Sequence, residues 1–289
     1  MVEKQAASKY THETVPTQFV EANGTRYAYR RFGKAGTVPL LFLGYFNSNM
    51  DAWDPAVTNS LADGREVILF DNAGVGASEG ETPPTVAEMT LHCVAFCRAL
   101  GLKSIHVVGF SLGGMIAQQM ALDHPELVQR LILLGTAPRG GEGLTFTELS
   151  PEEQADPVAF LLTAFFAPSA VSQAAGREYL KRLEYRTKDR DLPVSRNSAV
   201  AQLAAIREWG IIQATDRYAA LQKITHPTLI VHGNKDIVVD PINALILAEK
   251  LPNAELIVYW DSSHGAYSQH ATIFLEHLKL FLNAKGEVR

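Results

Sequence analysis

A serine lies between two glycines in the stretch SIHVVGFSLGGMIAQQMALDH, residues 104–124. Its pentapeptide GFSLG, residues 109–113, falls where an apolar run of strand length gives way to a helical pattern. A sharp strand-to-helix turn strains the backbone of the serine and raises its hydroxyl above the sheet. Ser111 is therefore a candidate nucleophile. The alternative is a serine that only caps the helix, with glycines for close packing.

A serine hydroxyl is a weak nucleophile at neutral pH, so this hypothesis requires a base and donors for the oxyanion. His264 follows the last apolar run, in the polar turn YWDSSHGAY, where an imidazole would be accessible. His106 and His232 lie inside predicted strands, and we interpret them as packed side chains. The backbone N–H of Leu112, at the start of the helix, points to where charge would develop on an attacked carbonyl.

Two carboxylates follow the apolar run at 226–233, in the sequence IVHGNKDIVVD. Asp236 lies in the turn itself, whereas Asp240 precedes Pro241 and has a competing role as a helix N-cap. The end of the run at 128–135 reads LLGTAPRG and offers no carboxylate. Asp236 is therefore the predicted acid that orients the base.

Apolar runs of strand length alternate with helical segments along most of the chain. Extended runs on both sides of Asn23-Gly24 predict an antiparallel hairpin over 18–33. The later runs are continuously apolar, which is typical of a mostly parallel sheet covered on both faces in an α/β protein. These predicted strands lie at 38–45, 65–70, 104–110, 128–135, 226–233 and 254–260, and the predicted helices at 83–101, 112–124, 241–251 and 265–283.

The segment between Gly135 and His226 lacks a strand pattern and is too long for an ordinary loop. We predict a helical cap, residues 137–223, inserted into a core formed by residues 1–136 and 224–289. Such a cap would cover the crevice at the carboxyl ends of the parallel strands. Its predicted helices lie at 151–166 with a break at Pro157, 169–185, 195–209 and 215–223.

Aromatic side chains of the cap are candidates for contact with a substrate. Phe160, Phe165 and Trp209 are the cap residues predicted to face the crevice, with Tyr45 and Phe110 as walls from the core. Most apolar side chains of a cap only pack helix against sheet. We therefore expect a small to medium, mainly apolar substrate and nothing narrower.

The composition excludes several kinds of partner. The chain has 289 residues, 47% of them hydrophobic, and a net charge of -5 with dispersed basic residues, which argues against nucleic acid. No apolar run reaches membrane-spanning length and no signal peptide pattern opens the sequence, so we expect a cytoplasmic monomer or homodimer without membrane contact. The two cysteines, Cys93 and Cys97, are expected in the core.

The chain resembles the α/β-hydrolase superfamily, in the capped serine-hydrolase branch of bacterial carboxylesterases and cofactor-free haloperoxidase-like perhydrolases. The order Ser111, Asp236, His264 is the order of that family. The turn FDNAGVGAS, residues 70–78, is similar to the family's D-x-x-G-x-G-x-S turn, and HPTLIVHGNKDIVV to its acid loop. The resemblance implies a mostly parallel, eight-stranded sheet flanked by helices, with an inserted helical cap.

The resemblance also places a second oxyanion donor after the strand at 38–45. The family usually has His-Gly-x there, followed by a tryptophan. Counting back from Trp53 puts Gly44 at the His, Tyr45 at the Gly and Phe46 at the donor position. A backbone N–H donates whatever its side chain, so Phe46 is the expected donor. Tyr45 is a departure that brings a phenol toward the site.

We expect no cofactor and no metal. DNAGVGASEG misses the G-x-G-x-x-G spacing of a dinucleotide loop, and GKAGT lacks the ending of a phosphate loop. The resemblance implies hydrolysis of a small-molecule carboxylic ester through an acyl-enzyme. Carbon–carbon bond hydrolysis and peracid formation use the same residues and stay open. A ligand-sensing protein with a vestigial triad is the non-enzymatic alternative.

Overall fold

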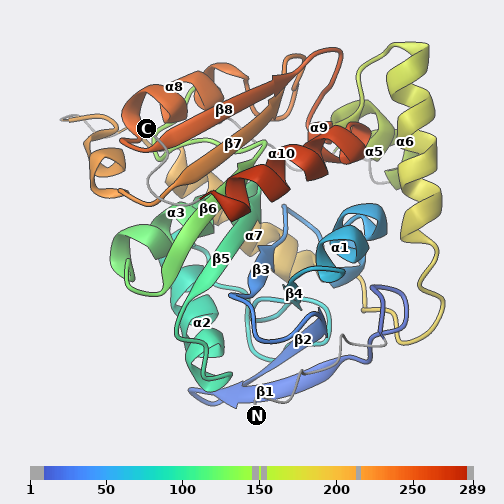
Figure 1. The fold of residues 1–289 in the computed structure, drawn as a ribbon, viewed down its shortest axis with the longest axis vertical. Coiled ribbons are helices and arrows are strands. Elements are labelled where there is room, and N and C mark those ends of the chain that lie inside the picture. Colours follow the sequence, from blue (N-terminus) through green and yellow to red (C-terminus); the bar gives the residue numbers. More distant parts are fainter. Residues whose placement is uncertain (1–9, 145–149, 151–154, 213–215, 285–289) are drawn as a thin grey trace.

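The computed structural model describes residues 10–144, 150, 155–212 and 216–284. Its centre is an eight-stranded sheet in the order β1-β2-β4-β3-β5-β6-β7-β8 (Figure 1). The β1–β2 and β2–β4 pairs are antiparallel and the other neighbours are parallel. The strands are β1 (Gln18–Ala22), β2 (Thr25–Gly33), β3 (Leu40–Leu43), β4 (Glu66–Phe70), β5 (Ile105–Phe110), β6 (Val128–Leu134), β7 (Thr228–Gly233) and β8 (Ala254–Tyr259).

Helices cover both faces of this sheet, with α2, α3 and α8 on one face and α1, α9 and α10 on the other. The α-helices described are α1 (Pro55–Ala62), α2 (Val86–Ala99), α3 (Leu112–Asp123), α5 (Pro157–Phe165), α6 (Ala170–Leu183), α7 (Arg196–Trp209), α8 (Ile242–Lys250), α9 (Ala266–Gln269) and α10 (Ala271–Asn283), and the 3-10 turns are η1 (Met50–Ala52) and η2 (Ala219–Lys223).

Side chains along the central strands alternate between two apolar clusters. In β5, Ile105 and Val107 pack with α2 and α3, whereas Val108 and Phe110 pack with α1 and α10. Both sets are buried, because a central parallel strand has helices on each side. This burial explains why the strand reads as a continuous apolar run.

The predicted sheet is confirmed, and its strands begin and end within two residues of the predicted runs. The hairpin turns at Asn23 and Gly24, whose φ angles of 52° and 77° match the left-handed geometry of a tight turn. Helix α1 was not predicted, although Asp54 caps it and Pro55 opens it. Residues 151–154 and 215 of two predicted cap helices lie outside the described residues. Within the described residues, no helix combines the length and apolar content of a membrane span.

Helices α5, α6 and α7 and the turn η2 lie in the chain between β6 and β7, a segment that we call the β6–β7 insertion. Its first part, α5 and α6, packs in the apolar cluster of α1 and α10. Its later part, α7, packs in the cluster of α2 and α3. The insertion therefore reaches both sides of the sheet edge at which β5 ends. Its division from the core at residues 137 and 223 stays a prediction.

Buried ion pairs tie the end of α6 and the segment after it to the core. Arg182 donates to both carboxylate oxygens of the fully buried Asp54, at 2.8 and 2.7 Å. Asp191 lies 3.0 Å from Arg30 of β2, and Arg186 donates to the backbone carbonyl of Val15. Removing one partner of such a buried pair leaves an uncompensated charge, which costs about 3–5 kcal/mol.

The turn between β5 and α3 depends on two residues without side chains. A Cβ at Gly109 would overlap the backbone of Gly113, and a Cβ at Gly113 would overlap the carbonyl oxygen of Leu43 at the end of β3. These two glycines therefore let the start of α3 lie directly against the ends of β3 and β5.

We expect Gly113→Ala to lower the free energy of unfolding by about 1–3 kcal/mol, because the new methyl group overlaps backbone that cannot move aside. Alanine is otherwise the better helix former by about 1 kcal/mol, so the sign of the change is informative. Urea denaturation measures it. Gly64→Ala is the control, since a Cβ there meets nothing within 4 Å. Equal stabilities of the two variants would contradict this account.

Candidate active site

Ser111 occupies the turn between β5 and α3 in a strained conformation, with φ 53° and ψ -113°. Its N–H donates to Leu134 O at 2.9 Å, and its carbonyl accepts from the Thr136 hydroxyl at 2.7 Å. Such strain costs on the order of 1–3 kcal/mol and persists only where surrounding contacts hold it. The Ser111 side chain makes no capping hydrogen bond to α3, which argues against the capping interpretation.

Leu112 is the first residue of α3, so its N–H belongs to the helix end that lacks intrahelical partners. The first hydrogen bonds of α3 are those that the N–H groups of Gly114 and Met115 donate to the carbonyl oxygen of Ser111. An N–H at this position carries the positive end of the helix dipole. Leu112 thus has the location that an oxyanion donor requires, and its role stays a prediction.

His264 and Asp236 form a buried pair at the same edge of the sheet. Asp236 Oδ2 lies 2.8 Å from His264 Nδ1, and both residues are less than 10% exposed. A Cβ at Gly135, directly after β6, would lie 3.1 Å from His264 Nδ1. The imidazole therefore lies against the end of β6, and a carboxylate side chain at this strand end would meet the ring. Pairing through Nδ1 leaves Nε2 for another partner.

His232 contacts the same carboxylate, which corrects our interpretation of it as a merely packed side chain. Its Nε2 lies 3.1 Å from Asp236 Oδ2 and 2.9 Å from the carbonyl oxygen of Val239. Both neighbours are acceptors, so Nε2 carries the proton. Burial alone would raise the pKa of Asp236, but the charge of His264 and the hydrogen bonds from His232 and His264 hold it well below its usual range. Asp236 is thus an anion at neutral pH. His106 is a packed side chain, with a pKa lowered to about 4 by burial.

Asp240, the alternative carboxylate of this segment, lies at the start of α8. Its Oδ1 accepts from the Ile242 N–H at 2.9 Å, as expected of a helix-capping side chain. The Asp236 Oδ1, by contrast, accepts from Val238 and Val239 within its own loop. These bonds fix the Asp236 carboxylate so that its Oδ2 faces the two histidines.

The loop that carries His264 is bound to α5 of the β6–β7 insertion. The His264 N–H donates to Ala164 O at 3.3 Å, and the Gly265 N–H to Phe165 O at 2.8 Å. The Ser263 hydroxyl donates to the same Ala164 carbonyl at 2.7 Å. The last carbonyls of α5, which lack helical partners, thus fix the position of the His264 backbone.

Four of the predicted substrate-contact residues share one apolar cluster. The Phe110 ring lies 4.8 Å from the His264 ring between centroids, and the Phe165 ring lies 5.5 Å from it. Tyr45 is 5.1 Å from each of these phenylalanines, and the half-buried Phe160 packs in the same cluster. These rings form an apolar wall beside the imidazole.

Trp209 is separate from this wall. It belongs to the cluster of α2 and α3, its indole N–H donates to Ala137 O at 3.1 Å, and Arg139 stacks over its ring. The structure therefore does not bring it together with Phe110 and Phe165. Trp209 lies in the β6–β7 insertion, but helical spacing in the sequence could not tell which side of the sheet edge it would reach.

The Tyr45 side chain is half-buried, and its phenol lies in the protein interior. Burial raises its pKa to about 12, more than a hydrogen bond with Tyr179 lowers it. Tyr179 in turn donates to the carbonyl oxygen of Ala52 at 3.0 Å. Tyr45 is thus a neutral phenol at physiological pH, and its ring is part of the apolar wall.

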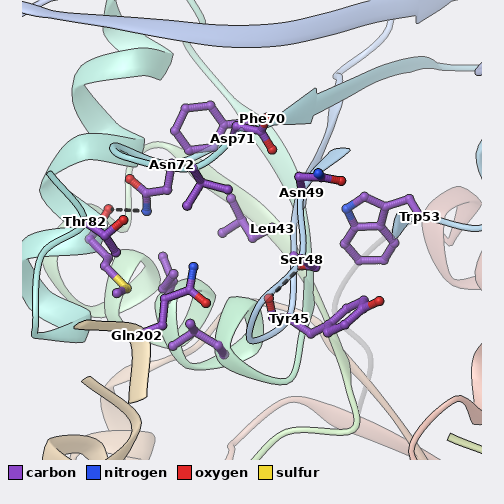
Figure 2. Close-up of a pocket in the computed structure, with 15 residues that line it drawn as sticks. Leu43, Tyr45, Ser48, Asn49, Trp53, Phe70, Asp71, Asn72, Thr82 and Gln202 are labelled. Carbon is purple, nitrogen blue, oxygen red and sulfur yellow. Dashed lines mark hydrogen bonds between the residues drawn. The ribbon is translucent and has the colours of Figure 1, made fainter. Parts of the chain in front are cut away.

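A small cavity of about 40 Å³ lies behind the loop that follows β3 (Figure 2). Leu112, Tyr45, Ser48, Asn72 and Gln202 are among the residues that line it. Ligand pockets usually hold roughly 300–1,000 Å³, so this cavity is too small to be the complete substrate site.

The turn at residues 70–78 supports that loop. The Asp71 Oδ1 accepts from the Met50 N–H at 2.9 Å, and a Cβ at Gly76 would overlap Asp71 Oδ2. The Ser78 hydroxyl donates to Asp71 O and accepts from the Ala28 N–H. Burial raises the pKa of Asp71 well above its usual range. The motif therefore fixes the start of η1, next to the loop with the predicted donor Phe46. No group of metal-ligating side chains is present in the part of the chain described.

The architecture agrees with comparisons to known proteins. Residues 38–271 match the family model for the alpha/beta hydrolase fold. The chain belongs to the α/β-hydrolase fold family. The match covers most of the core and the whole β6–β7 insertion, and it confirms the resemblance read from the sequence.

Several α/β hydrolases are similar to this chain. An alpha/beta hydrolase fold protein from Chitinophaga pinensis is 40% identical, with a TM-score of 0.89 over 96% of this chain and all of that one. Est816, described as an N-acyl homoserine lactone degrading enzyme, is 29% identical, with a TM-score of 0.70 over 91% and 99% of the two chains. A 2-hydroxymuconate semialdehyde hydrolase from Pseudomonas putida is 28% identical over 223 residues, 75% of this chain and 77% of that protein. The family and these names support hydrolase activity.

Within this α/β hydrolase, Asp236→Asn should lower kcat for an ester substrate by about 10³–10⁴-fold, because the amide no longer stabilises the charged, correctly oriented imidazole. Asp240→Asn is the matched control, since Asp240 caps α8, and it should retain nearly full kcat. Steady-state kinetics of the two variants measure the difference. A larger loss at Asp240 would transfer the role of the acid to that residue.

Proposed function

We propose that this α/β hydrolase cleaves small to medium, mainly apolar carboxylic esters through a serine acyl-enzyme. The observation that carries the proposal is the strained Ser111 at the start of α3, at the same sheet edge as the buried His264–Asp236 pair. A capping serine would need neither the strain nor the pair. A strained backbone lowers the stability of the protein, and such strain is typical of residues that take part in a reaction.

In the proposed reaction, His264 Nε2 accepts the proton of Ser111 as Oγ attacks the ester carbonyl. The N–H groups of Leu112 and Phe46 hold the resulting oxyanion. The C–O bond of the ester then breaks, and the alcohol leaves with the proton from His264. Water repeats these steps on the acyl-enzyme and releases the acid. Asp236 stabilises the imidazolium in both halves.

The apolar wall beside His264 supports the preference for apolar substrates. Phe110 and Phe165 lie against the ring of His264, and Tyr45 stays an uncharged phenol. An acyl or alcohol group beside the imidazole would therefore contact rings instead of charges. The similarity to an N-acyl homoserine lactone degrading enzyme extends the candidates to cyclic esters.

Carbon–carbon bond hydrolysis is a second candidate, favoured by the similarity to 2-hydroxymuconate semialdehyde hydrolase. Peracid formation is a third use of the same residues. A screen of open-chain esters, lactones and a vinylogous diketone separates the first two activities. Comparing hydrolysis with peracid production from acetate and peroxide separates the third.

Sustained hydrolysis of p-nitrophenyl acetate or butyrate is expected from the wild-type protein, and Ser111→Ala should lower kcat to the background rate because no nucleophile remains. Release of p-nitrophenol over many turnovers is the measurement. A single burst without further release would favour a ligand-sensing protein with a vestigial triad. Unchanged hydrolysis by Ser111→Ala would remove the serine from the mechanism.

A further inference from the structure

The loop after β3 is a tight turn with two N–H groups in its centre. The Ser48 N–H and hydroxyl both donate to Tyr45 O, at 3.2 and 2.6 Å, which closes the turn over Phe46 and Asn47. Asn47 has a φ of 61°, the left-handed conformation found at the third position of type II turns. Closing such a turn uses neither central N–H, so those of Phe46 and Asn47 depend on partners outside it.

One of these two N–H groups is bound by the β6–β7 insertion. Asn47 donates to Gln202 Oε1 at 2.7 Å, across a separation of 155 residues. Gln202 lies on α7 and is 4% exposed. Figure 2 shows its side chain reaching into the cavity toward the loop of Tyr45 and Ser48. The other central N–H, that of Phe46, takes no part in this hydrogen bond.

We propose that Gln202 is a positioning residue for the oxyanion hole, an inference that rests on the proposed ester hydrolysis. Its hydrogen bond holds the peptide group between Phe46 and Asn47, whose orientation distinguishes a type II turn from a type I turn. A fixed plane keeps Asn47 left-handed and the adjoining Phe46 N–H pre-aligned for the developing oxyanion. Donors that are aligned before reaction need no reorganisation in the transition state.

The position of Gln202 depends on how α7 is held. The Ser198 hydroxyl, one turn earlier on the same helix, donates to Gly74 O at 2.6 Å. At the end of α7, the Trp209 indole donates to Ala137 O. Helix α7 therefore has fixed contacts on both sides of Gln202. Through this residue, the same segment that covers the site also sets one of its donors.

The test replaces Gln202 by methionine, which has a similar length and no acceptor. With p-nitrophenyl butyrate, Gln202→Met should lower kcat about 10- to 100-fold, less than the roughly 10²–10³-fold loss of a whole oxyanion donor. KM should change less than about threefold, because the ground-state carbonyl binds the hole weakly. The affinity for phenylboronic acid, which forms a tetrahedral adduct with the serine, should fall in parallel with kcat.

Two further variants separate positioning from general loosening of α7. Gln202→Glu keeps a carboxylate acceptor for the Asn47 N–H and should recover most of the lost kcat. Ser198→Ala removes the neighbouring contact of α7 with Gly74 but keeps the Gln202 acceptor and the Trp209 contact, so it should lower kcat far less than Gln202→Met does. Thermal unfolding of each variant establishes that it is folded.

Wild-type kcat and boronate affinity in a folded Gln202→Met protein would overturn the proposal, as would an equal loss of kcat in Ser198→Ala. The proposed function fails differently, through absent ester turnover by the wild-type protein or full activity of Ser111→Ala. Absent turnover would also remove the oxyanion role assigned to Phe46, and the inference about Gln202 with it.

Discussion

The arrangement of the site depends on a contact between backbones, at the point where α3 begins against the ends of β3 and β5. Gly109 and Gly113 leave no space for a Cβ there, so peptide groups lie directly against peptide groups. This closeness forces Ser111 into its left-handed conformation and puts the start of α3 beside the loop after β3. The proposed nucleophile and the two proposed oxyanion donors thus depend on one packing constraint, and a methyl group at either glycine would disturb all three.

The remaining parts of the site are fixed from outside the sheet. The last carbonyls of α5 hold the loop of His264, and Gln202 of α7 holds the turn of Phe46. These two helices of the β6–β7 insertion pack in opposite apolar clusters. The insertion therefore contributes polar contacts to both the proposed base and the proposed oxyanion hole. A substitution in α5 or α7 would therefore also affect the proposed catalytic groups that these helices contact.

The sequence predicted what depends on local pattern. Continuous apolar runs predicted the sheet, and the positions of Asp236 and His264 at strand ends identified the pair that lies 2.8 Å apart in the structure. The contact of His232 with Asp236 was missed, because a position inside a strand does not show which carboxylate the imidazole contacts. Gln202 was missed because its partner is 155 residues away. No spacing rule relates an α7 side chain to a loop after β3, and the same limit explains the side of the sheet that Trp209 reaches.

The pair of Arg182 with Asp54 constrains how a substrate enters. The carboxylate of Asp54 is fully buried and accepts both hydrogen bonds of the guanidinium, and the Ser268 hydroxyl donates to it as well. Swinging α6 outward would leave this anion in the interior without its cation, at a cost of about 3–5 kcal/mol. The pair therefore opposes outward movement of the end of α6, so access to the buried Ser111 costs less where the insertion has no such buried charge.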